Sequence, residues 1–188
     1  PMDVQTRIGM PLDEFIREYD KAPFELVNGE RIPVVPTVAI HGEIIRVLVM
    51  LLAKLNGIVF YTDTPFVRDE KSDWVRGSRV PDFMAYRVTR WTDYKNATPD
   101  WRERPFALIP DLCVEVVSKI DNYEDVDDKV AEYLQLGVSM VWVIKPRSEV
   151  ITLHVAERVQ RLTATDLLTG GDVLPGFSVP VADIFPKA

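Results

Sequence analysis

The sequence has few features of secreted or membrane-spanning proteins. Cys113 is its only cysteine, so no disulfide can form within the chain, and a cytoplasmic location is expected. The longest apolar run, Ile44 to Leu55, is interrupted by Arg46 and Lys54. It is also shorter than the roughly 20 apolar residues that a membrane span needs. No signal-peptide pattern opens the chain, so we expect a protein that has no membrane partner.

Positive charge is also scarce. The 188 residues include 22 lysines and arginines against 29 aspartates and glutamates, which gives a net charge of −7. This balance argues against a broad electropositive surface that grips nucleic acid without specificity. It leaves room for a small acidic metal site inside a locally basic groove. The hydrophobic fraction of 47% is enough for a sizeable core, and the length suits one domain, residues 2–188.

Apolar periodicity predicts helices at 12–19, 37–55 and 122–136. Thr37 is expected to cap the second helix, and Asp121 or Asn122 the third, because short polar side chains can accept a hydrogen bond from the first helical turn. Asp128 and Glu132, both in the third helix, are expected to point away from its apolar stripe.

Strands are expected between and after these helices. Asn28-Gly29 lies between two β-like runs and favours positive φ at both positions, which predicts a hairpin over 24–35. The polar stretch 87–105 is predicted to be a long loop, and the apolar tail 171–186 is predicted to pack along a sheet edge. The order of elements predicts a mixed sheet with a few helices, of class α/β or α+β. Further strands are expected at 58–62, 65–68, 79–86, 112–117, 140–144, 150–155 and 158–162.

One predicted strand contains an acid. In LCVEVV, Leu112 to Val117, the alternation of a strand places Glu115 on the same face as Cys113 and Val117. Taking an unpaired carboxylate out of water costs several kcal/mol or shifts its pKa until it is neutral. Glu115 is therefore expected to have a partner.

Asp82 and Lys129 are the candidate partners. Asp82 lies at or near the start of an apolar strand, and two carboxylates on neighbouring strands could share Mg²⁺, which prefers oxygen ligands. Such a metal can activate water and neutralise charge on a phosphate. Lys129 flanks the apolar stripe of its helix, where its amine could reach the sheet. The alternatives are structural pairing of the two acids and an ordinary surface position for the lysine.

The order of the motifs resembles a known family. FELVNGE, His41 at a helix start, VPD, PDLCVEVVS, DKVAEYLQLGVSMVWVIKP and LPGFSVPVADIF are similar, in this order, to the Uma family of restriction endonuclease-like proteins. This family was formerly catalogued as a domain of unknown function and belongs to the PD-(D/E)XK nuclease superfamily. The resemblance covers about Leu12 to Phe185. It implies an αβββαβ core with a helix on each face of a mixed sheet, an N-terminal helix and hairpin, and additional C-terminal strands.

The resemblance also implies roles for individual residues. Asp82 and Glu115 match the two acids of the family and, with the carbonyl of Val116, would hold Mg²⁺ or Mn²⁺. The superfamily normally has a lysine two residues after the second acid, where this sequence has Val117. In this family a lysine on the following helix takes that place, which points to Lys129.

Other positions match the family as accessory residues. Glu25 would assist metal binding from the hairpin, and Ser118 and Tyr133 would line the site. His41 also matches, although a hydrogen-bonded core histidine is the alternative for a residue on an apolar helix face. Lys119, just past the end of the strand, is a second candidate for the missing lysine.

Basic and aromatic residues alternate in 87–105. This pattern suits phosphate contacts and base stacking, but it also suits a loop packed by its own aromatics or an oligomer contact. The basic residues that would contact nucleic acid are Arg90, Lys95, Arg102 and Arg104, with Trp91, Tyr94 and Trp101 between them.

These observations predict a metal-dependent DNA endonuclease that hydrolyses phosphodiester bonds with metal-activated water. The first alternative is a catalytically inactive nuclease-fold module that binds nucleic acid or a protein partner. The second is a structural homodimer or higher homo-oligomer in which the acids form ion pairs. Carboxylates of Asp82 and Glu115 that lie close together, with the Lys129 amine beside them in an open cleft, would favour the enzyme. A Lys129 that points to bulk solvent, or a Glu115 held by an arginine, would favour a binding or structural role.

Overall fold

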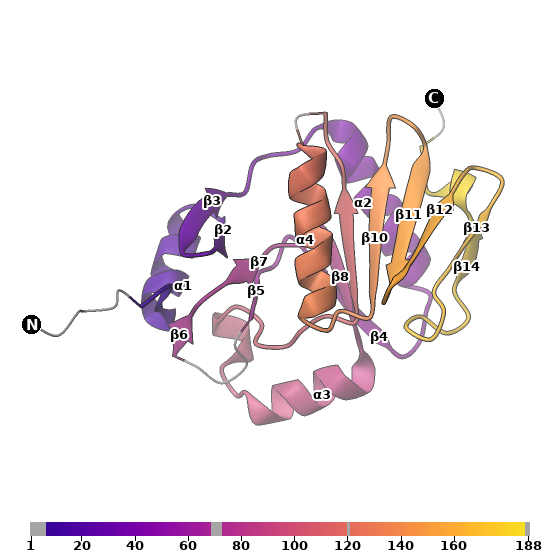
Figure 1. The fold of residues 1–188 in the computed structure, drawn as a ribbon. Helices are drawn as coiled ribbons and strands as arrows, with labels where there is room; N and C mark the ends of the chain where they lie inside the picture. Colours follow the sequence, from indigo (N-terminus) through magenta and orange to yellow (C-terminus); the bar gives the residue numbers. More distant parts are fainter. Residues whose placement is uncertain (1–6, 69–72, 120, 187–188) are drawn as a thin grey trace, which may run out of the picture.

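A six-stranded mixed sheet forms the centre of the protein (Figure 1). The computed structural model describes residues 7–68, 73–119 and 121–186. The strand order is β12-β11-β10-β9-β8-β4, in which β9 and β10 are parallel and all other neighbours are antiparallel. The strands are β4 (Ile58–Thr62), β8 (Phe83–Arg87), β9 (Leu112–Val116), β10 (Met140–Lys145), β11 (Val150–Val155) and β12 (Arg158–Leu162).

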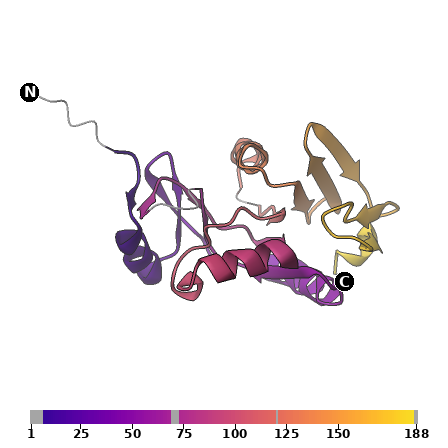
Figure 2. The same ribbon diagram turned by 90° about the horizontal axis from the view of Figure 1, so that it is seen from below.

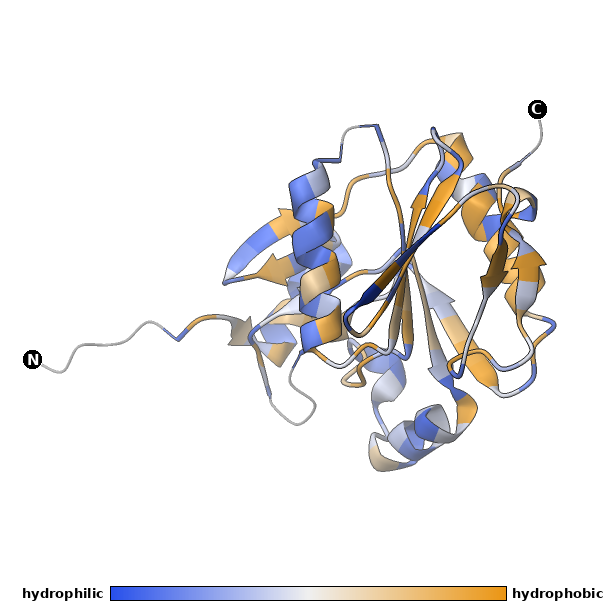
Figure 3. Ribbon diagram, turned by 45° about the vertical axis from the view of Figure 1, so that its right-hand side comes forward, coloured by the Kyte–Doolittle hydropathy of each residue, from blue (hydrophilic) through white to orange (hydrophobic). Residues whose placement is uncertain are grey.

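Two helices cover opposite faces of this sheet (Figure 2). On one face α4 (Tyr123–Gln135) packs Val130 and Tyr133 against Cys113 of β9. On the other, α2 (Ala39–Leu52) packs Ile44 and Leu48 in a cluster that includes alternate residues of β9 and β10. Figure 3 shows hydrophilic residues on the outward side of α4, as expected for a helix with one buried stripe.

A second, smaller sheet lies beside the N-terminal helix α1 (Leu12–Lys21). Its order is β3-β2-β7-β5, and the chain turns from β2 to β3 at Asn28 and Gly29, whose φ angles are 51° and 86°. The predicted hairpin is therefore confirmed. The strands are β2 (Phe24–Val27), β3 (Glu30–Pro33), β5 (Phe66–Val67) and β7 (Ser78–Arg79), and β1 (Met10–Pro11) pairs with β6 (Trp74–Val75) nearby.

The predicted fold class is confirmed, but several details of the prediction are wrong. Residues 87–105 are not a long loop: they contain α3 (Val88–Ala97) and a short 3₁₀ turn (Trp101–Glu103). The helix forms because Trp91 and Tyr94, three residues apart, pack one face into an aromatic cluster with Phe106. The predicted strand 79–86 is divided into β7 and β8 around Pro81, which has no backbone N–H to donate to a ladder.

Two further predictions about element ends need correction. Thr37 does not cap α2, because the N-cap residue is Val38 and no side chain accepts a hydrogen bond there. Asn122, by contrast, caps α4 by accepting from the Glu124 N–H at 3.2 Å. No helix among the described residues is both long and apolar enough to cross a membrane.

The C-terminal tail covers a face of the central sheet rather than an edge. It contains the two-stranded pair β13 (Leu167–Thr169) and β14 (Ser178–Pro180), followed by a 3₁₀ turn (Val181–Asp183). Phe177 stacks on Trp142 of β10 with ring centroids 5.7 Å apart. The tail therefore completes the core on the α2 side, because Met140, Trp142 and Ile144 of β10 point to that side and need apolar cover there.

Candidate active site

Glu115 lies on the α4 side of β9, as its alternation with Cys113 predicts. Its side chain is buried, with 8% of the residue exposed. The Tyr133 hydroxyl donates a hydrogen bond to Glu115 Oε1 at 2.7 Å, and the Lys129 ammonium donates one to Oε2 at 3.0 Å. Burial raises the pKa of Glu115 to about 7, an effect that the nearby Lys129 opposes. The expected partner of this carboxylate is thus present, and it is the lysine from the following helix.

Lys129 is held between two carboxylates. Its Nζ lies 3.0 Å from Glu115 Oε2 and 2.9 Å from Glu25 Oε1 of β2. Burial by itself would lower the pKa of Lys129, but Glu115 and Glu25 outweigh burial and raise it. The amine is therefore a cation at neutral pH. It faces the sheet rather than bulk solvent, which meets the part of the criterion that concerns Lys129.

Asp82 lies between β7 and β8 and reaches the residue after Glu115. Its Oδ2 accepts a hydrogen bond from the Val116 N–H at 2.7 Å. His41 Nε2 of α2 lies 3.0 Å from the same oxygen, although the orientation of the two groups is not that of a hydrogen bond. Burial would lower the pKa of His41, but the neighbouring Asp82 carboxylate outweighs burial and raises it. His41 is therefore a buried histidine that lies beside the first acid, which is close to the alternative of a core histidine.

Glu25 is held by groups from the small sheet. Arg79 donates to its Oε2 at 3.0 Å, and the Val80 N–H donates to its Oε1 at 2.9 Å. Burial by itself would raise the pKa of Glu25, but Lys129, the Val80 N–H and Arg79 together lower it. The carboxylate is thus ionised and engaged on both oxygens. Its expected part in metal binding stays a prediction.

Arg79 and Glu132 belong to the same network, and the sequence did not single out Arg79. The guanidinium of Arg79 contacts Glu25 and Glu132, with 2.9 Å between its Nε and Glu132 Oε2. Glu132 was expected to point away from the apolar stripe of α4, and this is wrong. It turns toward β7 because Arg79, which is itself buried, needs a second anionic partner.

The remaining candidates, Ser118 and Lys119, follow the end of β9. Lys119 is exposed beyond the end of β9, and the Ser118 N–H donates to Asp121 Oδ2 at 2.6 Å. The carbonyl of Val116 as a metal ligand stays a prediction. Among the described residues, no group of three or more His, Cys, Asp or Glu side chains is arranged to hold a metal. The two acids Asp82 and Glu115 still offer the oxygen donors that Mg²⁺ prefers.

The basic residues of 87–105 are engaged within the protein. Arg90 pairs with Asp111 at 2.8 Å, and Arg104 pairs with Asp100 at 3.5 Å. Lys95 and Arg102 lie over the ring of Trp101. The aromatics that were expected to stack on bases do not all face solvent, because Trp91 and Tyr94 are buried. The alternative of a segment packed by its own aromatics fits the structure better.

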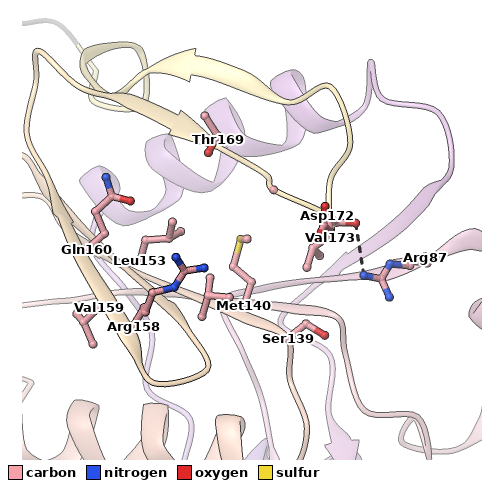
Figure 4. A pocket seen from close by; sticks show the side chains of 12 residues that line it. Arg87, Ser139, Met140, Leu153, Arg158, Val159, Gln160, Thr169, Asp172 and Val173 are labelled. Carbon is pink, nitrogen blue, oxygen red and sulfur yellow. Dashed lines mark hydrogen bonds between the residues drawn. The ribbon is translucent and has the colours of Figure 1, made fainter.

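A pocket of 680 Å³ lies away from the candidate site (Figure 4). It opens between the β11–β12 hairpin and the C-terminal tail, where Arg87 donates to the Asp172 carbonyl at 3.4 Å. None of its lining residues belongs to the cluster around Glu115. The candidate site is therefore defined by its polar contacts and not by the pocket.

Comparison with known proteins identifies the family of this chain and a solved structure with a similar fold. Residues 12–182 match the model of the Uma2 family, described as "Putative restriction endonuclease". The chain belongs to the Uma2 family. A solved structure, a "putative nuclease belonging to DUF820" from Anabaena variabilis, superposes with a TM-score of 0.72 at 17% sequence identity, covering 94% of this chain and 97% of the other. At this identity the likeness shows the fold alone. No match was found among curated proteins.

Proposed function

We propose that this Uma2 protein is a Mg²⁺- or Mn²⁺-dependent endonuclease that hydrolyses phosphodiester bonds in DNA. The observation that carries the proposal is the ion pair between Glu115 on β9 and Lys129 on α4, with Asp82 bonded to the backbone beside it. Two acids and a lysine held at one end of a β-strand are the groups that metal-assisted phosphate hydrolysis requires. The family description and the similar nuclease structure support the same reaction class.

Each residue would have a distinct task in this reaction. Asp82 and Glu115, with the Val116 carbonyl, would hold the metal, which supplies an activated water and neutralises charge on the phosphate. Tyr133 would orient Glu115 through its 2.7 Å hydrogen bond, and His41 would orient Asp82. These contacts restrict the two carboxylates to one arrangement before substrate arrives.

Lys129 would act as a fixed positive charge. Because Glu115 and Glu25 raise its pKa, it stays protonated and is unsuited to accept a proton from the attacking water. Its ammonium would instead stabilise negative charge that develops on the phosphate. Lys129 would thus take the place of the lysine that the superfamily normally has two residues after the second acid, where this chain has Val117.

An inactive nuclease-fold module that binds nucleic acid or protein is the second candidate. Both oxygens of Glu115 are already engaged, by Tyr133 and Lys129, and the net charge of −7 weakens attraction to a polyanion. A metal ion would have to share Glu115 with the ammonium.

Nicking of supercoiled plasmid separates the two candidates. With Mg²⁺ or Mn²⁺ the purified wild-type protein should nick the plasmid, and a chelator should stop it. Asp82→Ala, Glu115→Ala and Lys129→Ala should each lose cleavage, whereas Asp128→Ala, on the exposed side of the same helix, should retain it. Cleavage that persists unchanged in Glu115→Ala, or wild-type protein that binds DNA without cutting it, would favour the second candidate.

A further inference from the structure

Arg79 of the small sheet contacts two carboxylates near Lys129: Glu25, which pairs with the Lys129 ammonium, and Glu132, which follows Lys129 on α4. It lies at the end of β7 with only 8% of the residue exposed. One side of its guanidinium binds Glu25 of β2, and the other side binds Glu132 of α4. Arg79 is thus the point at which β2, β7 and α4 are fixed to one another.

The two arms of this arrangement converge on Lys129. Glu25 accepts a hydrogen bond from Arg79 through Oε2 and contacts the Lys129 ammonium through Oε1. The position of the guanidinium therefore determines where the carboxylate, and with it the ammonium, lies. Glu132 lies one helical turn after Lys129, so its contact with Arg79 fixes the rotation of α4. The contact with Glu132 thus positions the helix from which the Lys129 side chain extends. The contact with Glu25 positions the carboxylate that the Lys129 ammonium binds.

We propose that Arg79 is a positioning residue for Lys129, acting through Glu25 and Glu132. The inference rests on the endonuclease function proposed above. When Glu115 binds the metal ion, its ion pair with Lys129 is weakened, and Glu25 is the other carboxylate in contact with the ammonium. Arg79 and the Val80 N–H keep Glu25 in place, so the ammonium stays beside the reacting phosphate instead of following Glu115.

Within this proposal Glu25 acts as a positioning residue. Both of its oxygens already accept hydrogen bonds or ion pairs from groups of the small sheet and from Lys129. Glu25→Gln keeps the shape of this side chain but removes its charge, so the variant tests whether the Lys129 ammonium needs this anion.

Four variants test the inference. Arg79→Ala removes one partner from the buried Glu25 carboxylate and from Glu132 and is expected to lower stability. Arg79→Lys, which keeps the charge, and Glu25→Gln, which keeps the shape of the side chain, therefore carry the test. Arg68→Ala is the matched control, because Arg68 contacts Glu132 at 3.6 Å from the exposed side. We expect kcat to fall about 10- to 100-fold in Arg79→Lys and Glu25→Gln, as for other residues that orient an active group. KM should stay at the wild-type value in these two variants, and Arg68→Ala should keep the wild-type kcat.

A second measurement is independent of cleavage. The rate at which an amine-acylating reagent modifies Lys129, followed by peptide mass spectrometry in the absence of metal, should rise in Arg79→Lys and Glu25→Gln and stay slow in Arg68→Ala. Lys21, which is exposed on α1, serves as the internal reference. Wild-type kcat and unchanged Lys129 labelling in a folded Arg79→Lys protein would overturn the positioning role. A wild-type protein that fails to cleave, with labelling that still responds to Arg79, would instead overturn the endonuclease function alone.

Discussion

Glu115 and Glu25 contact the same ammonium group, yet their surroundings shift their pKa values in opposite directions. Burial raises the pKa of Glu115 from 4.5 to about 7, whereas Lys129, the Val80 N–H and Arg79 outweigh burial and lower that of Glu25. A group whose pKa is raised in the folded state stabilises the fold at low pH and loses that contribution as pH rises through its folded value. The metal-free protein should therefore lose stability from Glu115 between pH 4.5 and 7.

The perturbation that isolates this effect is Glu115→Gln. The amide can still accept from Tyr133, but it does not ionise, so the variant lacks the pH-dependent loss. The difference between a pKa of 4.5 and one of about 7 corresponds to about 3 kcal/mol at pH values above both. The free energy of unfolding of Glu115→Gln relative to wild type should thus rise by about 3 kcal/mol from pH 4.5 to 8.5, or roughly 6–12 °C in Tm for a domain of this size.

Urea unfolding in the presence of a chelator, at pH values from 3.5 to 8.5, measures this difference. Glu25→Gln provides the contrast, because a lowered pKa gives stability that is present above the ordinary value of 4.5 and is lost as pH falls below it. Its free energy of unfolding relative to wild type should therefore fall as pH rises through the acid range. A Glu115→Gln difference that is independent of pH, or two variants that change in the same direction, would refute the reasoning.

Three further outcomes follow from single contacts. Tyr133→Phe removes the hydroxyl that donates to the buried carboxylate on β9, so the free energy of unfolding at pH 8 should fall by about 1–3 kcal/mol in urea titrations. The pKa of His41 measured by NMR should lie above its ordinary value and drop in Asp82→Asn. Gly137→Ala, at φ 96°, should lower stability by about 1 kcal/mol in thermal unfolding, whereas Gly42→Ala, inside α2 with open space around it, should raise stability by a similar amount.

The site residues that could be predicted from sequence are those whose direction follows from the residue pattern of a single strand, helix or turn. Alternation in LCVEVV fixed the face of Glu115, and helical periodicity placed Lys129 beside the apolar stripe that faces that strand. Asn28-Gly29 fixed the hairpin that holds Glu25, because both positions require positive φ. In each case the side chain's direction follows from the geometry of one element.

The contacts of Arg79 and the existence of α3 could not be predicted in this way. The partners of Arg79 come from β2 and α4, 54 and 53 residues away in the chain, and no periodicity within β7 indicates them. The direction of Glu132 was predicted wrongly for the same reason. The apolar stripe of α4 predicts which side of the helix is buried, but it does not indicate a buried cation on another element, such as Arg79, that attracts an acid. In α3 only Trp91 and Tyr94 are buried, which is too few apolar positions for helical periodicity to stand out.

The replacement of the strand lysine by Val117 is compatible with catalysis because α4 crosses the same face of the sheet as Glu115. A lysine at position 117 would extend from β9 itself, and its charge would need no support from other elements. A lysine on α4 depends on the placement of the helix, and this chain has additional ion pairs that fix that placement, from Arg79 to Glu132 and from Glu25 to Lys129. The network across the small sheet is thus the physical condition under which a helix can supply the cation that the strand lacks.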